Sequence, residues 1–435
     1  MKIFWLVNTI FPYPAEQLNI EKTVFGGWLN SLLNGIIESN EISEIAIVSL
    51  YNGTIIKKYK DKKIVYYLIP TKNQLKYSKN LSNELVKILD EFSPDLVHIH
   101  GTEYPQSLSA IEACNKRNIK NLVSVQGLVS KCGLNYNYFA GLPLKNIMLN
   151  ITLRDIYKGD PLFLQPSKFR KRGKYEIEVL KKTNCIVGRT SWDEAHSYDI
   201  CRVKKYKKCY ESLRECFYGS NWKITDIERN TIFMSQASFP IKGFHKMILA
   251  AKIIKDKYPN IKIYVAGADI IKNKTNSFFE KIKITGYGKF LKKQIIKNKL
   301  ESNIIFTGML NEKQILDMLL KTHVFVQSSS LENSPNSLGE AMLIGMPCVA
   351  SYVGGVSDML LDKKEGLLYP FNEHEMLAKY VMDIFENDDY AIFLGKNAQE
   401  HAKKTHNIEK NSKKMINIYK ELLGDKNDKK DKEYN

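Results

Sequence analysis

Short apolar runs alternate with longer amphipathic stretches along most of this chain, and this alternation limits the fold more than any other feature. In the first half the apolar runs lie at residues 3–7, 45–49, 64–69, 96–100, 122–125 and 185–187. In the second half they lie at residues 232–234, 261–266, 304–306, 324–327 and 347–350. Strands that alternate with helical stretches are typical of βαβ units and a mainly parallel sheet. The sequence therefore predicts an α/β protein with two Rossmann-like domains.

Interruptions of this alternation set the expected domain boundaries. Residues from about 131 to 174 are rich in Tyr, Asn, Gly and Pro, so we interpret them as an insertion in an N-terminal domain of residues 1–205. The C-terminal domain is expected to cover residues 206–390, and helices at 391–424 are expected to pack back across the hinge. The polar residues 425–435 cannot bury enough surface to become ordered, so a disordered tail is predicted.

Composition excludes several classes of protein. No stretch approaches the roughly 18 apolar residues that a membrane-spanning helix requires, and Asn8 and Thr9 interrupt the apolar start. A cleavable signal peptide is not recognisable before Pro12, so a cytoplasmic protein is expected. The seven cysteines include no CxxC pair, which argues against a disulfide framework and a zinc site.

The formal net charge of +18 leaves three kinds of partner open: phosphates, nucleic acid and the anionic inner face of a membrane. A nucleic-acid binder should carry a basic stripe with interleaved stacking aromatics, and no such stripe is evident outside the insertion. We therefore expect no nucleic-acid partner. The basic, aromatic insertion suggests peripheral contact with a membrane surface or a lipid-linked acceptor, with a solvated loop as the alternative.

The segment at residues 324–349 contains the strongest functional pattern. Ser334 to Ser337 provide capping and turn residues, and the apolar spacing that follows predicts a helix that starts near Asn336. A helix N-terminus at the carboxyl edge of a parallel sheet is suited to bind a diphosphate. Two carboxylates, Glu332 and Glu340, flank this position. Because phosphates would repel them, we interpret both as acceptors for hydroxyl groups, one on a sugar and one on a ribose.

The E-x7-E spacing in LENSPNSLGEAM, followed by GMPCVAS and VGGVSDML, resembles retaining glycosyltransferase family 4, the group 1 glycosyltransferases of the GT-B fold. The resemblance implies two facing Rossmann-like domains with a cleft between them. It also implies that Glu332 lies by the donor sugar, that Glu340 binds the ribose, and that the helix start at Asn336, Ser337 and Leu338 takes the pyrophosphate.

A second match is FPIKGFHK, in which Lys242 resembles the lysine of the family that contacts the donor phosphates. A cation at this position would stabilise the departing nucleoside diphosphate. Six residues earlier the family often has an arginine, whereas this chain has Gln236. Arg189, at the end of the first half, is a further candidate that could replace the missing charge.

Several weaker matches complete the predicted site. Gly26 and Gly27 in FGGW resemble the glycine loop of the family, which lets the backbone approach donor and acceptor closely. Gly267 and Gly308 follow strands where related enzymes leave room for the nucleotide. Gln126 stands where the family often has a histidine near the donor sugar, and it is assigned to the catalytic set with Glu332 and Lys242.

Neither a metal nor an organic cofactor is expected. His98 and His100 share one strand face, but no third ligand is nearby, so structural histidines are favoured. The sequence has no Asp-x-Asp pair of the kind that binds a metal-diphosphate complex. A GxGxxG fingerprint after the first strand is also missing, which argues against an oxidoreductase.

We therefore expect a retaining, metal-independent glycosyltransferase of the hexosyltransferase type. Its donor would be a UDP- or GDP-linked sugar and its acceptor a saccharide or a lipid-linked oligosaccharide, in the biosynthesis of a bacterial surface polysaccharide such as capsule, O-antigen or lipopolysaccharide. Two alternatives remain, namely a nucleotide-sugar epimerase of the same fold and a non-catalytic protein that binds nucleotide sugars.

Overall fold

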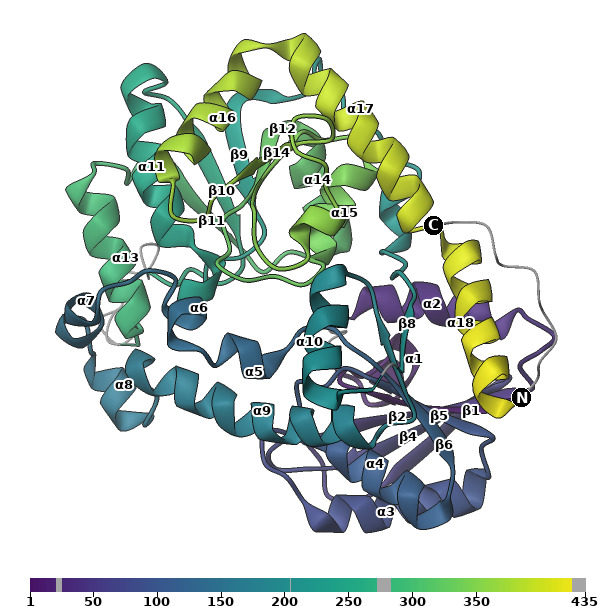
Figure 1. Cartoon of the computed structure of the whole chain (residues 1–435). Helices are drawn as coiled ribbons and strands as arrows, with labels where there is room; N and C mark the ends of the chain where they lie inside the picture. The colour runs from purple at the N-terminus through teal and green to yellow at the C-terminus, as the bar shows by residue number, and fades with distance from the viewer. Residues whose placement is uncertain (21–25, 204, 272–282, 425–435) are drawn as a thin grey trace. The chain divides into compact units, whose positions relative to one another are not determined.

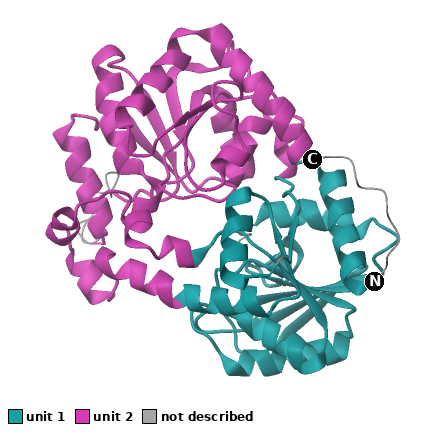
Figure 2. Ribbon diagram, viewed as in Figure 1, with its two compact units in different colours: residues 1–129, 172–213, 406–435 teal, residues 130–171, 214–405 magenta. Residues whose placement is uncertain are grey.

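The computed structural model describes residues 1–20, 26–203, 205–271 and 283–424. By its contacts the chain divides into two units, which are coloured separately in Figure 2. Unit 1 contains residues 1–129, 172–213 and 406–435, and unit 2 contains residues 130–171 and 214–405. The tail predicted at residues 425–435 lies outside the described residues.

Unit 1 is built on an eight-stranded sheet in the order β3-β4-β2-β1-β5-β6-β7-β8, in which only β3 runs antiparallel to its neighbour (Figure 1). Its strands are β1 (Lys2–Val7), β2 (Glu44–Tyr51), β3 (Lys57–Asp61), β4 (Ile64–Pro70), β5 (Leu96–His100), β6 (Lys120–Ser124), β7 (Cys185–Gly188) and β8 (Tyr206–Lys208). Its helices are α1 (Pro12–Gln17), α2 (Gly27–Ile37), α3 (Lys79–Phe92), α4 (Gln106–Arg117), α10 (Ser191–Cys201) and α18 (Ile408–Leu423), and α5 (Val129–Cys132) and α9 (Gln165–Lys182) continue into unit 2.

Strand β1 shows why both faces of this sheet must be covered. Its side chains alternate between two apolar clusters, with Ile3 and Trp5 in one and Phe4 and Leu6 in the other. A strand whose residues are apolar on both sides is typical of a parallel sheet with helices on each face. Helices α3 and α4 contribute to the Phe4 cluster, and α2 and α18 contribute to the Ile3 cluster.

Unit 2 is built on a six-stranded parallel sheet in the order β11-β10-β9-β12-β13-β14. Its strands are β9 (Glu228–Met234), β10 (Lys262–Ala266), β11 (Ile304–Gly308), β12 (Thr322–Gln327), β13 (Cys348–Ser351) and β14 (Leu367–Tyr369). Its longer helices are α11 (Phe244–Lys257), α13 (Gly286–Lys297), α14 (Glu312–Lys321), α15 (Asn336–Leu343), α16 (His374–Glu386) and α17 (Asp388–Thr405). The strand order reverses between β9 and β12, and such a switch point is where open α/β sheets bind ligands.

The segment predicted as an insertion in the N-terminal domain differs from that expectation, because the structure groups residues 130–171 with unit 2. It contains α6 (Asn135–Phe139), α7 (Leu144–Leu149), α8 (Leu153–Tyr157) and the 3-10 turn η1 (Leu162–Leu164). The hydroxyl of Ser330 donates to the carbonyl of Asn137 at 2.5 Å, and the backbone N–H of Gly286 donates to Asp155 at 2.8 Å. Hydrogen bonds to the rest of unit 2 therefore hold α6 and α8.

The C-terminal helices also divide between the units, because α17 belongs to unit 2 and α18 to unit 1. Helix α18 packs on α2, and its Tyr419 hydroxyl lies 2.7 Å from Nδ1 of His98 in β5.

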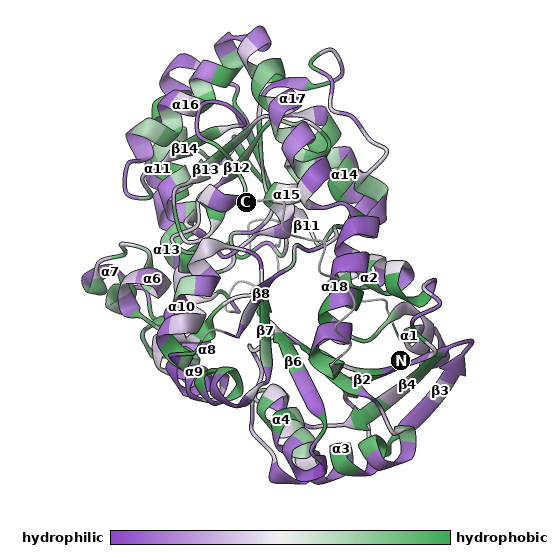
Figure 3. Ribbon diagram, turned by 45° about the vertical axis from the view of Figure 1, so that its right-hand side comes forward, coloured by the Kyte–Doolittle hydropathy of each residue, from purple (hydrophilic) through white to green (hydrophobic). Residues whose placement is uncertain are grey.

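Figure 3 contrasts the hydrophobic strand β7 with the hydrophilic edge strand β3. Among the described residues, no helix is long and apolar enough to cross a membrane.

Candidate functional site

Helix α15 begins at Asn336, where the sequence predicted a helix start, directly after the loop that follows β12. The N–H groups of Leu338 and Gly339 donate to the carbonyl of Pro335 at 3.0 and 3.2 Å, and the Leu338 side chain is fully buried. The first two N–H groups, those of Asn336 and Ser337, precede these bonds and belong to the groups that a helix leaves unsatisfied. They are thus better placed than that of Leu338 to receive an anion.

The sheet's switch point lies directly beside this helix start. The Ser337 hydroxyl hydrogen-bonds that of Ser235, which follows β9, at 3.1 Å. This bond joins the chain after β9 to the start of α15, so the helix N-terminus is fixed at the carboxyl edge of two neighbouring strands. A ligand bound there would lie in the crevice where α/β sheets place phosphates.

The structure brings the predicted catalytic pair Lys242 and Glu332 together. Nζ of Lys242 lies 2.6 Å from Oε1 of Glu332, and the Ser329 hydroxyl donates to the same oxygen at 2.7 Å. The two side chains keep 27% and 14% of their surface exposed, respectively. Both charges are therefore positioned by protein contacts while part of each remains accessible to a ligand.

Two glycines permit the backbone approaches that hold this pair. Gly243 has a φ of +67°, and a Cβ there would lie 1.6 Å from the carbonyl oxygen of Ser328. Gly354 has a φ of +54°, and a Cβ there would lie 1.8 Å from the carbonyl oxygen of Glu332. A side chain at either position would push the loops apart, so these glycines fix the separation of Lys242 and Glu332.

Glu340 is placed differently from Glu332. Only 3% of the residue is exposed, and its two carboxylate oxygens accept from Nε and Nη2 of Arg214, each at 2.6 Å. Burial raises the pKa of Glu340, and the Arg214 guanidinium opposes that rise. The paired contacts have the fork geometry of an ionised carboxylate with an arginine. Glu340 is thus a buried, arginine-bound carboxylate one turn into α15.

Sequence reasoning did not find Arg214. It precedes the 3-10 turn η2 (Glu215–Phe217) in a stretch with mixed charge and no periodicity, and its guanidinium lies 5.0 Å from the ring centroid of Phe217. No local motif marks this arginine as the partner of a glutamate 126 positions later. Only the tertiary contact identifies it.

Gly267, just after β10, lies beside Gly308, the last residue of β11, and the N–H of Gly267 donates to the carbonyl of Gly308 at 3.0 Å. Both have positive φ, and a Cβ on either would meet no atom within 4 Å. They thus leave open space at the same sheet edge, and the nucleotide contact expected there stays a prediction. Gln236, where the family often has an arginine, is exposed just after β9.

The remaining candidates lie in unit 1. Gly26, with a φ of +88°, is the N-cap of α2, and Gly27 is its first residue. Nε2 of Gln126 donates to Glu211 at 2.6 Å, and Nη1 of Arg189 forms an ion pair with the other oxygen of that carboxylate. Nη2 of Arg189 donates to the carbonyls of Val125 and Gln126 at 3.1 and 3.0 Å. Because Arg189 is 4% exposed and its charge is paired within unit 1, it is a poor substitute for the missing arginine.

His98 and His100 are both buried in unit 1. The His98 nitrogens lie 2.7 Å from the hydroxyls of Tyr419 and Ser124, and burial lowers the pKa of His100 to about 3. Over the described residues, no group of three or more His, Cys, Asp or Glu side chains is arranged to hold a metal ion. These contacts agree with the structural role that the sequence favoured.

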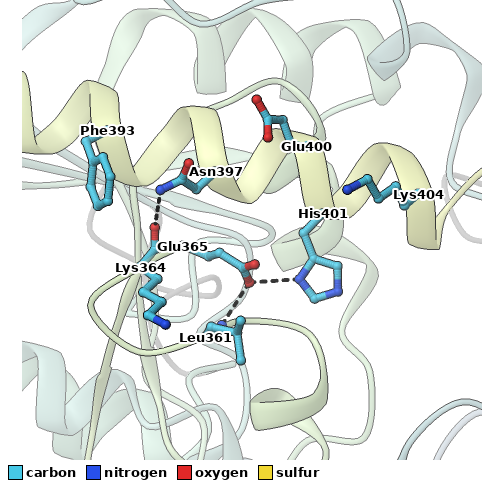
Figure 4. A pocket seen from close by; sticks show the side chains of 8 residues that line it. All are labelled: Leu361, Lys364, Glu365, Phe393, Asn397, Glu400, His401 and Lys404. Carbon is cyan, nitrogen blue, oxygen red and sulfur yellow. Dashed lines mark hydrogen bonds and ion pairs between the residues drawn. The ribbon is translucent and has the colours of Figure 1, made fainter. Parts of the chain in front are cut away.

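A separate cavity of about 510 Å³ in unit 2 is lined by residues of α17 and of the loop before β14 (Figure 4). Its Glu365 carboxylate accepts from His401 at 2.8 Å and from the N–H of Leu361 at 2.9 Å, and Asn397 donates to the Lys364 carbonyl at 2.9 Å. Its polar groups thus bind one another, and none of the predicted site residues lines it. The motif residues, and not this cavity, define the candidate site.

Comparison with known proteins agrees with this geometry. Residues 223–401 match the family described as Glycosyl transferases group 1. This part of the chain is therefore similar to that family. A similar protein is an uncharacterized glycosyltransferase of Methanocaldococcus jannaschii, 24% identical over 77% of this chain and 74% of its own length. Another is the poly(ribitol-phosphate) alpha-N-acetylglucosaminyltransferase of Staphylococcus aureus, 24% identical over 58% of this chain and 47% of its own length.

Among solved structures, Anabaena HepE in complex with UDP and glucose is similar to this chain. The two superpose with a TM-score of 0.67 at 15% sequence identity, covering 96% of this chain and 99% of HepE. This likeness concerns the fold, and it confirms the predicted GT-B fold with two Rossmann-like domains.

Proposed function

We propose that this glycosyltransferase moves a hexose, with retention of configuration, from a UDP- or GDP-linked donor to a saccharide or a lipid-linked oligosaccharide. The observation that carries the proposal is the partly exposed Lys242–Glu332 pair beside the start of α15. A cation and a helix N-terminus suit the diphosphate of a nucleotide sugar, and a carboxylate at the same sheet edge suits its sugar hydroxyls.

In this proposal Lys242 and the N–H groups of Asn336 and Ser337 hold the diphosphate. As the glycosidic bond breaks, negative charge grows on the departing diphosphate, and a fixed cation with fixed N–H donors stabilises that charge without reorganisation. Because Lys242 contacts Glu332 at 2.6 Å, its ammonium is already positioned before the donor arrives. Gly267 and Gly308 would leave the room that the nucleotide needs.

Glu332 is proposed to accept hydrogen bonds from the donor sugar and Glu340 from the ribose. The bond from Ser329 orients the Glu332 carboxylate and leaves acceptor capacity on it. Two hydrogen bonds from Arg214 hold the buried Glu340 carboxylate in place. Arg214 is thus a positioning residue for Glu340. The roles of Gly26, Gly27, Gln126 and Gln236 at the donor stay predictions.

The acceptor, the location and the metal requirement are further parts of the proposal. The name of the Staphylococcus aureus relative places that protein in the glycosylation of a ribitol-phosphate polymer, which supports a surface polysaccharide as the product here. We propose that the enzyme works in the cytoplasm in peripheral contact with the anionic inner membrane. Because Lys242 and the helix N-terminus provide the positive charge, we also propose that turnover needs no metal and survives treatment with EDTA.

The test combines donor binding with variants of the two carboxylates. Calorimetry with UDP, GDP and their hexose conjugates should identify one nucleotide that binds. Glu340→Gln should weaken nucleotide binding, whereas Glu332→Gln should lower turnover while nucleotide binding persists. Glu375→Gln, an exposed carboxylate on α16, is the matched control and should change neither. Wild-type binding and turnover in both site variants would exclude the assignment.

The same measurements separate the alternatives. A nucleotide-sugar epimerase would convert the donor alone into its epimer, which NMR of the sugar detects without an acceptor. A non-catalytic binder would show donor binding without turnover across an acceptor panel. The anomeric configuration of the product, also read by NMR, decides whether the transfer retains configuration.

A further inference from the structure

The helical segment of residues 130–171 carries an unusual share of the exposed apolar surface. Nine of the 23 large hydrophobic side chains that are exposed in the described residues lie in these 42 positions. Leu153 is 81% exposed, Ile156 is 66% exposed and Leu149 is 63% exposed. Single exposed apolar residues are ordinary on soluble proteins, but a cluster of them marks an interaction site.

These side chains project outward from two short helices. The opposite sides of the helices contact the rest of unit 2. In α8, Leu153, Ile156 and Tyr157 have the i, i+3, i+4 spacing of one helix face, and Asp155 on the opposite side is buried. In α7, Leu144 and Met148 are exposed one turn apart, and Ile147 is buried. We define the α7–α8 surface as Leu144, Met148, Leu149, Leu153, Ile156 and Tyr157.

The inner contacts make this surface a fixed feature of unit 2. The Thr152 hydroxyl donates to the carbonyl of Ile284 at 3.0 Å, and Asp155 accepts from the N–H of Gly286 at 2.8 Å. Thr152 and Asp155 also form a capping box at the start of α8. The exposed apolar side chains are therefore held outward by hydrogen-bonded neighbours.

The charge around the α7–α8 surface is strongly positive. Residues 130–171 contain seven Lys and Arg residues against two acidic residues, Asp155 and Asp160. Arg154 and Lys168 pair with these two acids, whereas in the described part of the chain no carboxylate pairs with Lys145 or Lys158. Helix α13, which contacts α7, adds four lysines and no acid.

We propose that the α7–α8 surface docks on the headgroup region of an anionic lipid bilayer. Apolar side chains enter the boundary between headgroups and acyl chains while neighbouring lysines bind the anionic headgroups, a combination typical of interfacial segments. A second copy of this chain fits the surface less well, because a symmetric contact would bring two lysine-rich faces together. The two helices have only six and five residues. A bilayer can bind so small a surface because it requires no shape complementarity.

This inference rests on the proposed function in one respect, the supply of a lipid-linked acceptor. The segment that carries the surface also bonds to the loop of the candidate site, since Ser330, two residues before Glu332, donates to the Asn137 carbonyl at 2.5 Å. His245, at the start of α11 beyond Lys242, lies 2.8 Å from the carbonyl of Ala140. A bilayer that holds this segment would thus hold the donor-binding unit at the surface where a lipid-linked acceptor resides.

Co-sedimentation of the full chain with lipid vesicles tests the proposal. Vesicles of phosphatidylcholine mixed with phosphatidylglycerol should bind the protein, and vesicles of phosphatidylcholine alone should bind it much more weakly. Leu149→Ser/Leu153→Ser/Ile156→Ser should weaken binding at least about tenfold, because three anchors are lost. The matched control, Ile55→Ser/Ile56→Ser/Leu75→Ser, removes three exposed apolar side chains of unit 1 and should bind like wild type.

A second pair of variants isolates the charge. Lys145→Glu/Lys158→Glu should abolish binding to the anionic vesicles. The control Lys363→Glu/Lys396→Glu changes the charge by the same amount elsewhere on unit 2 and should weaken vesicle binding much less. All these side chains are exposed, so the variants should unfold at the wild-type temperature. No vesicle binding by the wild type, or equal binding by the surface and control variants, would overturn the proposal.

Two additional measurements keep the outcomes separate. Sedimentation velocity shows whether the wild type is a dimer and whether the triple serine variant is a monomer. If both were so and the wild type bound no vesicles, the surface would be a dimer interface and the proposal would be overturned. Vesicle binding is measured without nucleotide, whereas calorimetry reports donor binding. Failure of the donor assay would therefore count against the proposed transfer reaction, and failure of the vesicle assay would count against membrane contact while leaving that reaction untouched.

Discussion

The carboxyl edges of the two sheets hold the same kind of buried ion pair but differ in what surrounds it. Unit 1 pairs Arg189 with Glu211, and unit 2 pairs Arg214 with Glu340, in both cases with little exposure. Unit 2 adds a second, partly exposed pair, Lys242–Glu332, and glycines whose missing side chains leave open space. In unit 1 the described side chains Gln126 and Arg189 instead bind Glu211.

This difference separates a structural pair from a ligand site. Removal of one partner from a buried arginine–carboxylate pair destabilises the fold, because the other partner is left as an unpaired charge in the interior. A site needs charges that are positioned yet still accessible, and the Lys242–Glu332 pair shows both properties. Glu340 is buried, and its contact with the ribose is part of the proposed function. The same type of sheet edge can therefore close into a core or open into a binding surface.

The largest effect is expected from the buried pair of unit 1. Arg189→Met should lower the free energy of unfolding by about 3–5 kcal/mol, because Glu211 would remain buried without its guanidinium. Urea unfolding measures this change. Arg229→Met, which removes an exposed partner of Asp388, is the control and should cost at most about 1 kcal/mol. If Arg189→Met weakened donor binding while stability stayed at the wild-type value, Arg189 would belong to the site and the comparison would break.

Removal of the partly exposed cation of unit 2 should affect catalysis more than folding. Lys242→Met should lower kcat/KM about 100- to 1,000-fold, the usual consequence of losing one group that stabilises developing charge. Steady-state kinetics measures it, with thermal unfolding as a check on the fold. Lys252→Met, an exposed lysine on α11, should keep the wild-type rate. Equal rates in the two variants would remove Lys242 from the mechanism.

Acid should destabilise unit 2 through His245. Burial lowers the pKa of His245 to about 4, against its hydrogen bond to Ala140, and Lys246 lowers it further. The folded pKa is below the unfolded value of 6.5, so the unfolded chain takes up the proton first. The stabilisation is fully present above pH 6.5 and is lost as the pH falls towards 4, by about 3 kcal/mol in all.

Unfolding free energies between pH 7 and pH 4 check this expectation. His245→Gln should flatten the pH dependence in that window, because the titrating group is gone. His401→Gln removes a partly exposed histidine of the same unit and is the control. A slope that His245→Gln leaves unchanged would assign the acid sensitivity to other buried histidines, such as His323, whose pKa burial also lowers to about 4.

The smallest effect is an increase in donor affinity, expected from a substitution at Gln236, the exposed position after β9. Gln236→Arg should tighten binding of the donor nucleotide by up to about tenfold, because a guanidinium can bind a phosphate with two parallel hydrogen bonds. Calorimetry at two salt concentrations measures it, and the gain should shrink at the higher one. Gln236→Met is the neutral control. An unchanged affinity in Gln236→Arg would mean that the diphosphate does not pass this position.

Most of the sheet architecture could be predicted because its strands are apolar on both faces. β5 was predicted with its observed bounds, and the other buried strands were predicted within a few residues. The strands β3, β8 and β14 were not predicted. β3 reads KKYKD and lies at the sheet edge with its residues partly or fully exposed, so no apolar run marks it. β14 has three residues and is too short to show a period.

The sequence by itself determined the parallel sheets and the start of α15, because these depend on local periodicity and capping residues. Its motifs also marked Lys242 and Glu332 as separate site residues, but only the structure shows that the two form an ion pair. Tertiary structure alone decided that Arg214 binds Glu340, that Arg189 is buried with Glu211, and that residues 130–171 belong to unit 2. Each of these depends on side chains or backbone groups that are far apart in the chain. Such contacts leave no periodic trace, because they are set by how the layers pack.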